Sequence, residues 1–176
     1  MSRGICILSQ NNFKTDYVKQ AYLLALSVKK TNPNLPVTLI TNDKVTDTQR
    51  KAFDEIKDIP WTDSAANSEW KVENRWKIYY ASPYEETIVL DADCIILNNI
   101  EHIFDFVKDK NIVYAKNART YRNELVTSDY YRKTFTANDL PNVYCGLQLF
   151  RKSPQASEFY KLLEMVFNNW NAFYDK

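Results

Sequence analysis

The chain has 176 residues, enough for one compact domain and too few for two. Its 23 lysine and arginine residues nearly balance 22 aspartate and glutamate residues, which gives no support to a nucleic-acid partner. With only two glycines, the chain has neither the glycine-rich dinucleotide fingerprint nor a P-loop. We therefore expect a single domain over residues 1–176, in which a few local cations or a metal would bind any anionic ligand.

Membrane and metal-cluster signals are missing from the sequence. No stretch approaches the roughly 20 apolar residues of a membrane helix, and the N-terminus lacks the apolar run of a signal peptide. Cys6, Cys94 and Cys145 are widely spaced in apolar segments and His102 is the only histidine, so a zinc cluster is not expected. Buried free thiols in a reducing compartment fit this pattern, which predicts a cytoplasmic protein without a transmembrane segment.

The first half of the chain alternates predicted strands and helices. Residues 5–8 form a short apolar run typical of a buried strand, and residues 17–28 carry apolar side chains at helical spacing. Residues 37–41 predict a second strand. Thr46 and Gln49 then form a capping box, which predicts a second helix that turns Ala52, Phe53 and Ile56 towards the core.

The second half continues this alternation. A helix is expected around residues 74–81 and strands are expected at 87–90, 112–114 and 147–150, while residues 94–97 continue the first of these as a second apolar run. The last helix begins with Ser153 as cap and Pro154 at its first position, followed by an apolar stripe of Phe159, Leu162, Leu163, Val166, Phe167 and Trp170. The pattern predicts an α/β fold, with helices on both faces of a mainly parallel sheet. Residues 117–142 show no clean periodicity, which favours a functional loop.

Two carboxylates interrupt the apolar segment over residues 87–97. Asp91 and Asp93 follow the predicted buried strand directly, where an unpaired anion costs several kcal/mol. Magnesium and manganese ions prefer carboxylate and phosphate oxygens, and ligands gather outside the carboxyl ends of strands in open α/β sheets. These two aspartates are therefore the candidate metal ligands, and a surface turn with two solvated aspartates is the alternative.

The chain resembles glycosyltransferases with the A-type fold, and especially the glycogenin-like, galactosyltransferase-like family. The Asp91-Ala92-Asp93 segment resembles that family's Asp-x-Asp signature. The resemblance continues in order at residues 17–27, 45–51, 76–78 and 99–104, so it covers nearly the whole chain.

The resemblance implies a Rossmann-like nucleotide-diphospho-sugar transferase fold and transfer of a sugar from a UDP-linked donor with Mn2+ or Mg2+. It implies a hexosyltransferase-like enzyme acting on an unidentified glycan, protein or small-molecule acceptor, with retained anomeric configuration and no assigned catalytic base. The expected nucleotide-sugar contacts are Ser9, Tyr17, Lys77, Asp91, Ala92 and Asp93.

Departures from the family pattern occur at the acceptor side and at the end of the chain. The sequence has Tyr144-Cys145-Gly146 where the family has Asn-Ser-Gly or Asn-Ala-Gly, so these three residues are candidate sugar or acceptor contacts. The family's third metal ligand is a downstream histidine, for which His102 lies in the wrong segment. The resemblance thus implies a truncated or minimal version of the family.

Other interpretations stay open at this point. Arg75 and Lys77 could neutralise a diphosphate or be ordinary surface cations, and residues 117–142 could form a mobile flap or an ordered surface segment. A non-catalytic nucleotide-sugar-binding module is the alternative to an enzyme. A phosphatase of the haloacid dehalogenase type also uses Asp-x-Asp, but after its first strand and before a Gly-Thr turn, which this sequence lacks.

Overall fold

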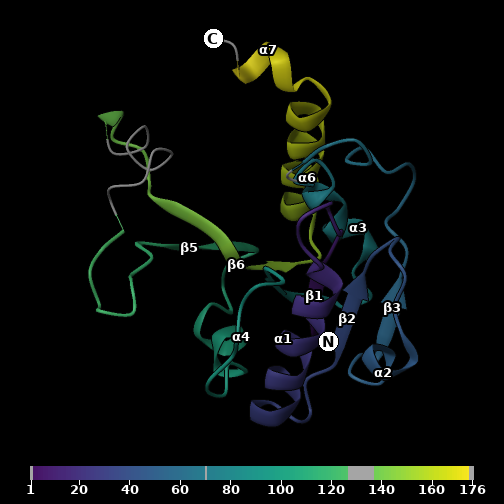
Figure 1. Ribbon diagram of the computed structural model, residues 1–176. Helices are drawn as coiled ribbons and strands as arrows, with labels where there is room; N and C mark the ends of the chain where they lie inside the picture. The colour runs from purple at the N-terminus through teal and green to yellow at the C-terminus, as the bar shows by residue number, and fades with distance from the viewer. Residues whose placement is uncertain (1, 70, 127–136, 175–176) are drawn as a thin grey trace.

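The protein is built on one six-stranded sheet, which the computed structural model describes for residues 2–69, 71–126 and 137–174 (Figure 1). The strands run in the order β3-β2-β1-β4-β6-β5. They are β1 (Arg3–Leu8), β2 (Val37–Ile40), β3 (Glu55–Lys57), β4 (Glu86–Leu90), β5 (Ile112–Lys116) and β6 (Val143–Arg151). Strands β1 to β4 pair in parallel, whereas β6 runs antiparallel to both β4 and β5. The predicted mainly parallel α/β sheet is confirmed.

Helices cover both faces of this sheet (Figure 1). On one face lie α1 (Tyr17–Thr31), the short α2 (Asp47–Arg50) and α4 (His102–Phe106). On the other lie the 3-10 turn η1 (Arg75–Lys77), α3 (Ile78–Ala81) and α6 (Pro154–Asn168), which is followed by α7 (Trp170–Tyr174). No described helix combines the length and the apolar character needed to cross a membrane.

Strand side chains alternate between the two cores, as the period of two requires. In β1, Ile5 and Ile7 pack against the α1 side, whereas Cys6 between them faces the α6 side. In β4, Ile88 and Val89 divide in the same way. The central strands β1, β2 and β4 are therefore buried on both faces, which explains their nearly continuous apolar sequences.

Helix starts follow the capping signals in the sequence. Thr46 and Gln49 form the predicted reciprocal capping box, and the Ser153 hydroxyl accepts from the Ala156 amide with Pro154 at the first helical position. Asp16, which the sequence pattern did not single out, caps α1 by accepting from the Lys19 amide. Each cap satisfies an amide that has no partner within its helix.

One predicted element is wrong, and one apolar run has no regular structure. The second helix ends at Arg50, and Ile56 lies in the parallel strand β3 instead of on a helix. The apolar run at residues 94–97 forms neither strand nor helix, since the chain turns after β4 and leaves Ile95 and Leu97 exposed by 55% and 80%. In both places the apolar pattern did not distinguish strand, helix and loop.

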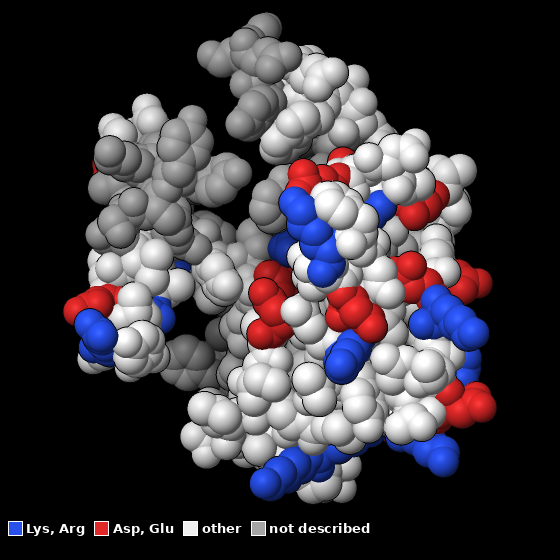
Figure 2. All heavy atoms as spheres, viewed as in Figure 1, with Lys and Arg blue, Asp and Glu red and all other residues white. Residues whose placement is uncertain are grey.

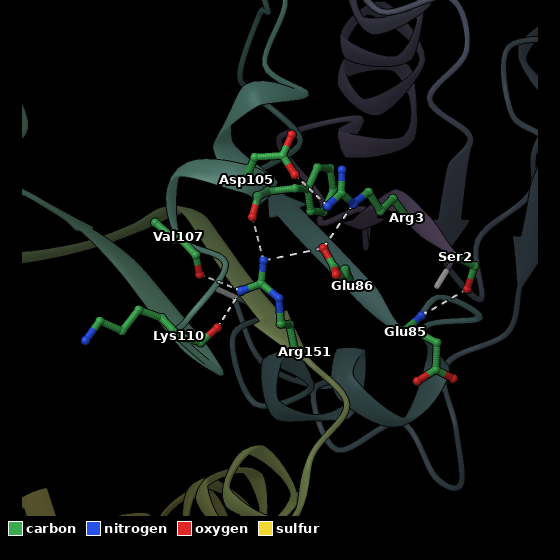
Figure 3. Close-up of polar contacts among 9 residues, drawn as sticks. Ser2, Arg3, Glu85, Glu86, Asp105, Val107, Lys110 and Arg151 are labelled. Carbon is green, nitrogen blue, oxygen red and sulfur yellow. Dashed lines mark hydrogen bonds and ion pairs between the residues drawn. The ribbon is translucent and has the colours of Figure 1, made fainter.

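A buried ion-pair cluster joins three strands at the amino edge of β4 (Figure 3). Glu86 pairs with Arg3 of β1 at 3.1 Å and with Arg151 of β6 at 3.4 Å. Arg3 also reaches Asp105 at 2.8 Å, and Arg151 donates to the Phe104 carbonyl oxygen at 2.6 Å. The cluster fastens α4 to the sheet on the edge opposite the end of β4 that leads into Asp91.

Charge and cysteine positions complete the picture. Acidic and basic side chains are interspersed on the face in Figure 2, in line with the near-zero net charge. Cys6 is buried, Cys94 is half-buried and Cys145 is exposed. The expectation of buried thiols is therefore correct for Cys6 and wrong for Cys145, which lies near the start of β6.

Candidate active site

A cavity of about 180 Å³ opens at the carboxyl edge of the sheet, between the ends of β1 and β4. Strand β1 has β2 on one side and β4 on the other, so its neighbouring connections leave in opposite directions at this point. Open α/β sheets bind ligands at such a switch point. The cavity is lined by Leu8, Gln10, Tyr17, Lys71, Val72, Arg75, Ile78, Val89, Leu90, Asp91, Ala92, Asp93 and Gln148.

The Asp91-Ala92-Asp93 segment forms a turn at the floor of the cavity. The Asp91 amide donates to the Gly146 carbonyl oxygen at 3.1 Å, which extends the β4–β6 ladder by one bond. The Cys94 amide then donates to the Asp91 carbonyl oxygen at 3.1 Å, which closes the turn. Both aspartates line the cavity, with Asp91 half-buried and Asp93 exposed.

Arg75 provides the cation that faces this carboxylate pair. One of its guanidinium nitrogens lies 2.9 Å from Asp91 Oδ1. Burial raises the pKa of Asp91, Arg75 lowers it and Asp93 raises it again, so that the pKa lies above the ordinary value. The half-buried Asp91 carboxylate, with the Asp93 charge beside it, is thus only partly compensated by Arg75 and favours further positive charge.

Lys77 lies outside the cavity, although the resemblance places it on the donor. The side chain is buried, and its ammonium donates to the Thr62 carbonyl oxygen and to Ser64 Oγ at 3.0 Å. Burial lowers the pKa of Lys77. Arg75, two residues earlier on the same turn, lines the cavity, whereas Lys77 does not, and the assignment of Lys77 to the donor stays a prediction.

A polar network behind the cavity was not anticipated from the sequence. Asn74 Nδ2 donates to Gln10 Oε1 at 2.7 Å and to Asp63 Oδ1 at 2.6 Å, and Gln10 Nε2 donates to Asp63 Oδ2 at 2.9 Å. Asn74 is fully buried, and Gln10 also lines the cavity. The one sequence signal was the polar stretch that directly follows the first strand.

Of the remaining expected donor contacts, two line the cavity and one does not. Tyr17, the first residue of α1, and Ala92 line the cavity. Ser9 is buried and does not line it. Its amide donates to the Ile40 carbonyl oxygen at 3.0 Å, whereas its Oγ has no hydrogen-bond partner among the described residues.

The candidate acceptor residues lie at the start of β6. Gly146 is buried beside Asp91, and a Cβ there would come within 2.3 Å of Tyr144 Cε1. Tyr144 and Cys145 are exposed and do not line the cavity, but Gln148, two residues further, does. Pairing of β6 with β4 thus brings this segment next to the aspartate turn.

Only part of the proposed flap lies in the described residues. Residues 117–126 form a small hairpin-like turn with a bridge between Arg119 and Leu125, and the ring of Tyr121 is 91% exposed. Tyr121 therefore does not anchor the segment in the core. Tyr130, Tyr131 and Phe135 lie outside the described residues, and the flap stays a prediction.

The residues at the cavity fit a divalent cation bound jointly with a phosphate ligand. Among the described residues, no group of three histidine, cysteine, aspartate or glutamate side chains comes together, so Asp91 and Asp93 would act as a pair. Magnesium commonly binds through one or two carboxylates together with substrate phosphates. His102 is an exposed residue of α4, as expected, and does not line the cavity.

Known proteins match this architecture. A family model described as "Mannosyltransferase putative" matches residues 2–132, whereas no curated protein sequence matches the chain significantly. The glycosyltransferase GlyE of Streptococcus pneumoniae TIGR4 aligns with a TM-score of 0.61 at 14% identity, over 94% of this chain and 39% of GlyE.

Two further solved structures are similar in fold. An active-site mutant of LgtC has a TM-score of 0.61 at 14% identity, over 98% of this chain and 65% of LgtC. Core-mannan synthase A of Aspergillus fumigatus, in its Mn/GDP form, has a TM-score of 0.56 at 8% identity, over 95% of this chain and 65% of the synthase. The chain therefore spans from about two fifths to just under two thirds of these proteins, and its fold is that of A-type glycosyltransferases.

Proposed function

The chain belongs to this mannosyltransferase family, and we propose that it transfers a sugar from a nucleoside-diphosphate donor to an acceptor at the cavity between β1 and β4. The observation that carries the proposal is the Asp91-Ala92-Asp93 turn at the sheet's switch point, with Arg75 beside it. A phosphatase of the haloacid dehalogenase type fits less well, because the turn follows β4 and not the first strand.

The chain's own residues suit the binding of a diphosphate. Arg75 presents a forked guanidinium, which matches phosphate oxygens in geometry and charge. Asp91 and Asp93 would hold Mn2+ or Mg2+, which as a Lewis acid neutralises charge developing on the leaving diphosphate. When phosphate occupies the cavity, Arg75 can exchange its 2.9 Å bond to Asp91 for bonds to the ligand.

The rest of the cavity would orient the donor. Tyr17 offers an aromatic ring at the start of α1, and Gln148 of β6 offers an amide. A volume of about 180 Å³ is below the roughly 300–1,000 Å³ of typical ligand sites, so the cavity accommodates only part of a nucleotide sugar. We assign that part to the diphosphate and its cation.

The sequence resemblance and the comparisons favour different bases for the donor nucleotide. The sequence resemblance favours a UDP-linked sugar, whereas the family description names mannosyl transfer and the fungal synthase was solved with Mn and GDP. Within the proposal we favour a GDP-linked mannosyl donor, because two independent comparisons point to it. Calorimetric titrations with UDP and with GDP under the same conditions, each with Mn2+, show which nucleotide binds more tightly and so test this choice.

Paired substitutions test the site itself. Asp91→Asn and Asp93→Asn should abolish Mn2+-dependent nucleotide binding while the melting temperature without ligand stays close to wild type. Asp109→Asn, an exposed carboxylate in the α4–β5 connection, is the matched control. Full nucleotide binding by the double aspartate variant would refute the proposed site. Binding without transfer of radiolabelled sugar would instead favour the non-catalytic module.

A further inference from the structure

Three aromatic rings form a cluster beside the donor cavity, which we call the Trp61 platform: Trp61, Trp76 and Tyr80. The Trp61 and Trp76 rings stack with centroids 5.4 Å apart and planes 20° from parallel. Tyr80 meets Trp61 edge-on at 5.1 Å. Trp76 is buried, whereas Trp61 is 65% exposed. Since Trp76 covers one face of the Trp61 indole, the exposed area lies mainly on the opposite face.

The backbone holds Trp61 in a costly conformation. Its φ of 60° lies in the left-handed region, where a bulky side chain is rare and costs about 1–3 kcal/mol. The neighbouring backbone is fixed on both sides: the Ile59 amide donates to Asn42 Oδ1 at 2.9 Å, and Lys77 donates to the Thr62 carbonyl oxygen. The fold thus keeps a strained backbone conformation at a residue whose indole is largely exposed to solvent. Folding stability alone does not explain this arrangement.

The platform lies close to the proposed donor site without belonging to it. Trp61 follows β3, so it lies at the same carboxyl edge of the sheet as the cavity. The η1–α3 turn serves both places, because Arg75 and Ile78 line the cavity while Trp76 and Tyr80 contact Trp61. None of the three platform rings lines the cavity.

Polar groups lie near the platform. Thr62, next to Trp61, is exposed, and Glu164 of α6 acts electrostatically on Tyr80 and Lys77. Trp76 Nε1 is buried and has no hydrogen-bond partner among the described residues, so it is not part of the exposed surface. An exposed, flat, apolar ring with polar side chains nearby suits a ligand that is apolar on one face and hydroxylated at its rim.

We propose that the Trp61 platform binds a hexose ring of a carbohydrate acceptor. The proposal rests on the proposed function and gives the acceptor its chemical class. The C–H groups on one face of a hexose pack against an aromatic ring, while the hydroxyls stay hydrated or bond at the rim. A protein partner fits less well, because a stable interface buries about 800 Å² per partner and one tryptophan supplies only about 150–250 Å².

Saturation-transfer NMR with mannotriose, recorded without nucleotide, tests the platform. Trp61→Gly is the informative variant, because glycine adopts a φ of 60° without strain and removes only the indole. We expect transfer to the sugar C–H protons in the wild type and at least about tenfold weaker binding in Trp61→Gly, equivalent to about 1.4 kcal/mol. Trp61→Phe should retain part of the signal because it keeps a flat ring.

Controls separate this proposal from the donor site. Phe106→Ala removes an 87% exposed ring from α4, on the opposite face of the sheet, and should leave the sugar signal unchanged. Absence of signal in the wild type, equal signals in wild type and Trp61→Gly, or equal loss in Phe106→Ala would each overturn the platform. Nucleotide calorimetry on the same samples reports on the proposed function, so sugar binding without nucleotide binding would refute the donor site alone.

Discussion

Separate substitutions of Lys77 and Arg75 test which cation binds the donor phosphate. The sequence resemblance favours Lys77, whereas Arg75 lines the cavity in the structure. In Lys77→Met the aliphatic stem remains, but the bonds to the Thr62 carbonyl oxygen and Ser64 Oγ are lost. Hydrogen bonds from a charged donor contribute about 1.5–3 kcal/mol each, and release of the buried charge offsets part of this. We therefore expect a loss of about 2 kcal/mol, or about 4–8 °C in melting temperature, and little change in nucleotide affinity.

Arg75→Met should have the opposite effects on melting temperature and nucleotide affinity. The side chain is 39% exposed and lines the cavity, so its loss should leave the melting temperature nearly unchanged. Loss of a charge-assisted contact to phosphate of about 1.5–3 kcal/mol corresponds to about 10- to 150-fold weaker nucleotide binding.

Differential scanning fluorimetry without ligand and calorimetry with GDP and Mn2+ give the two quantities needed. Lys161→Met, which removes an exposed lysine of α6, is the matched control for loss of positive charge. Weak nucleotide binding together with an unchanged melting temperature in Lys77→Met would refute the structural placement and restore Lys77 as the phosphate ligand.

Three further predictions concern stability. Glu86→Ala removes the buried carboxylate shared by Arg3 and Arg151, but Arg3 is 39% exposed and keeps Asp105, so the free energy of unfolding should fall by up to about 3 kcal/mol in urea titrations, the low end for a broken buried pair. Gly4→Ala places a Cβ 2.3 Å from the buried Tyr84 ring and should cost about 1–3 kcal/mol; combination with Tyr84→Leu should cost less than the sum of the two single changes, and strict additivity would contradict the clash. Burial raises the pKa of Asp54, but hydrogen bonds, first that from Lys29, lower it below its ordinary value. The stability that the Asp54 carboxylate contributes is thus present above about pH 3.9 and is lost as the pH falls through the lower folded-state pKa. The difference in melting temperature between wild type and Asp54→Asn should therefore shrink below about pH 4.

The fold was largely predictable because its signals are local. Buried parallel strands have continuous apolar runs, and the caps at Thr46 and Ser153 marked helix starts that the structure confirms. The irregular structure of residues 94–97 was not predictable, because apolar character does not reveal that the chain turns away after Asp93. The place of Asp91 and Asp93 at the cavity was predictable because carboxylates after a buried strand are costly without a partner, and their role as metal ligands stays a prediction.

Other parts of the site were not predictable, because they depend on contacts between distant segments. Arg75 and Lys77 lie on one tight turn, and nothing in their local sequence shows which cation faces the cavity and which is buried. The hydrogen bonds of Asn74 to Gln10 and Asp63 span 64 and 11 residues. The Trp61 platform likewise depends on a stacking partner 15 positions away and on a left-handed backbone at a non-glycine residue.

Because β6 runs antiparallel to β4, the two sides of the site tolerate sequence changes differently. On the β1 and β4 side, site residues follow their strands, and the Asp91 turn is tied to the core by the ladder that precedes it. On the β6 side, the site residues Gly146 and Gln148 lie within the strand, and the Asn117 amide donates to the Asn142 carbonyl oxygen at 3.1 Å, so residues 117 and 142 meet just before the strand begins. Changes in length between these two residues are therefore expected to leave the register of β6 intact. Under the proposed function, exchange of the sequence between them is expected to change acceptor choice while donor binding at the Asp91 turn is preserved.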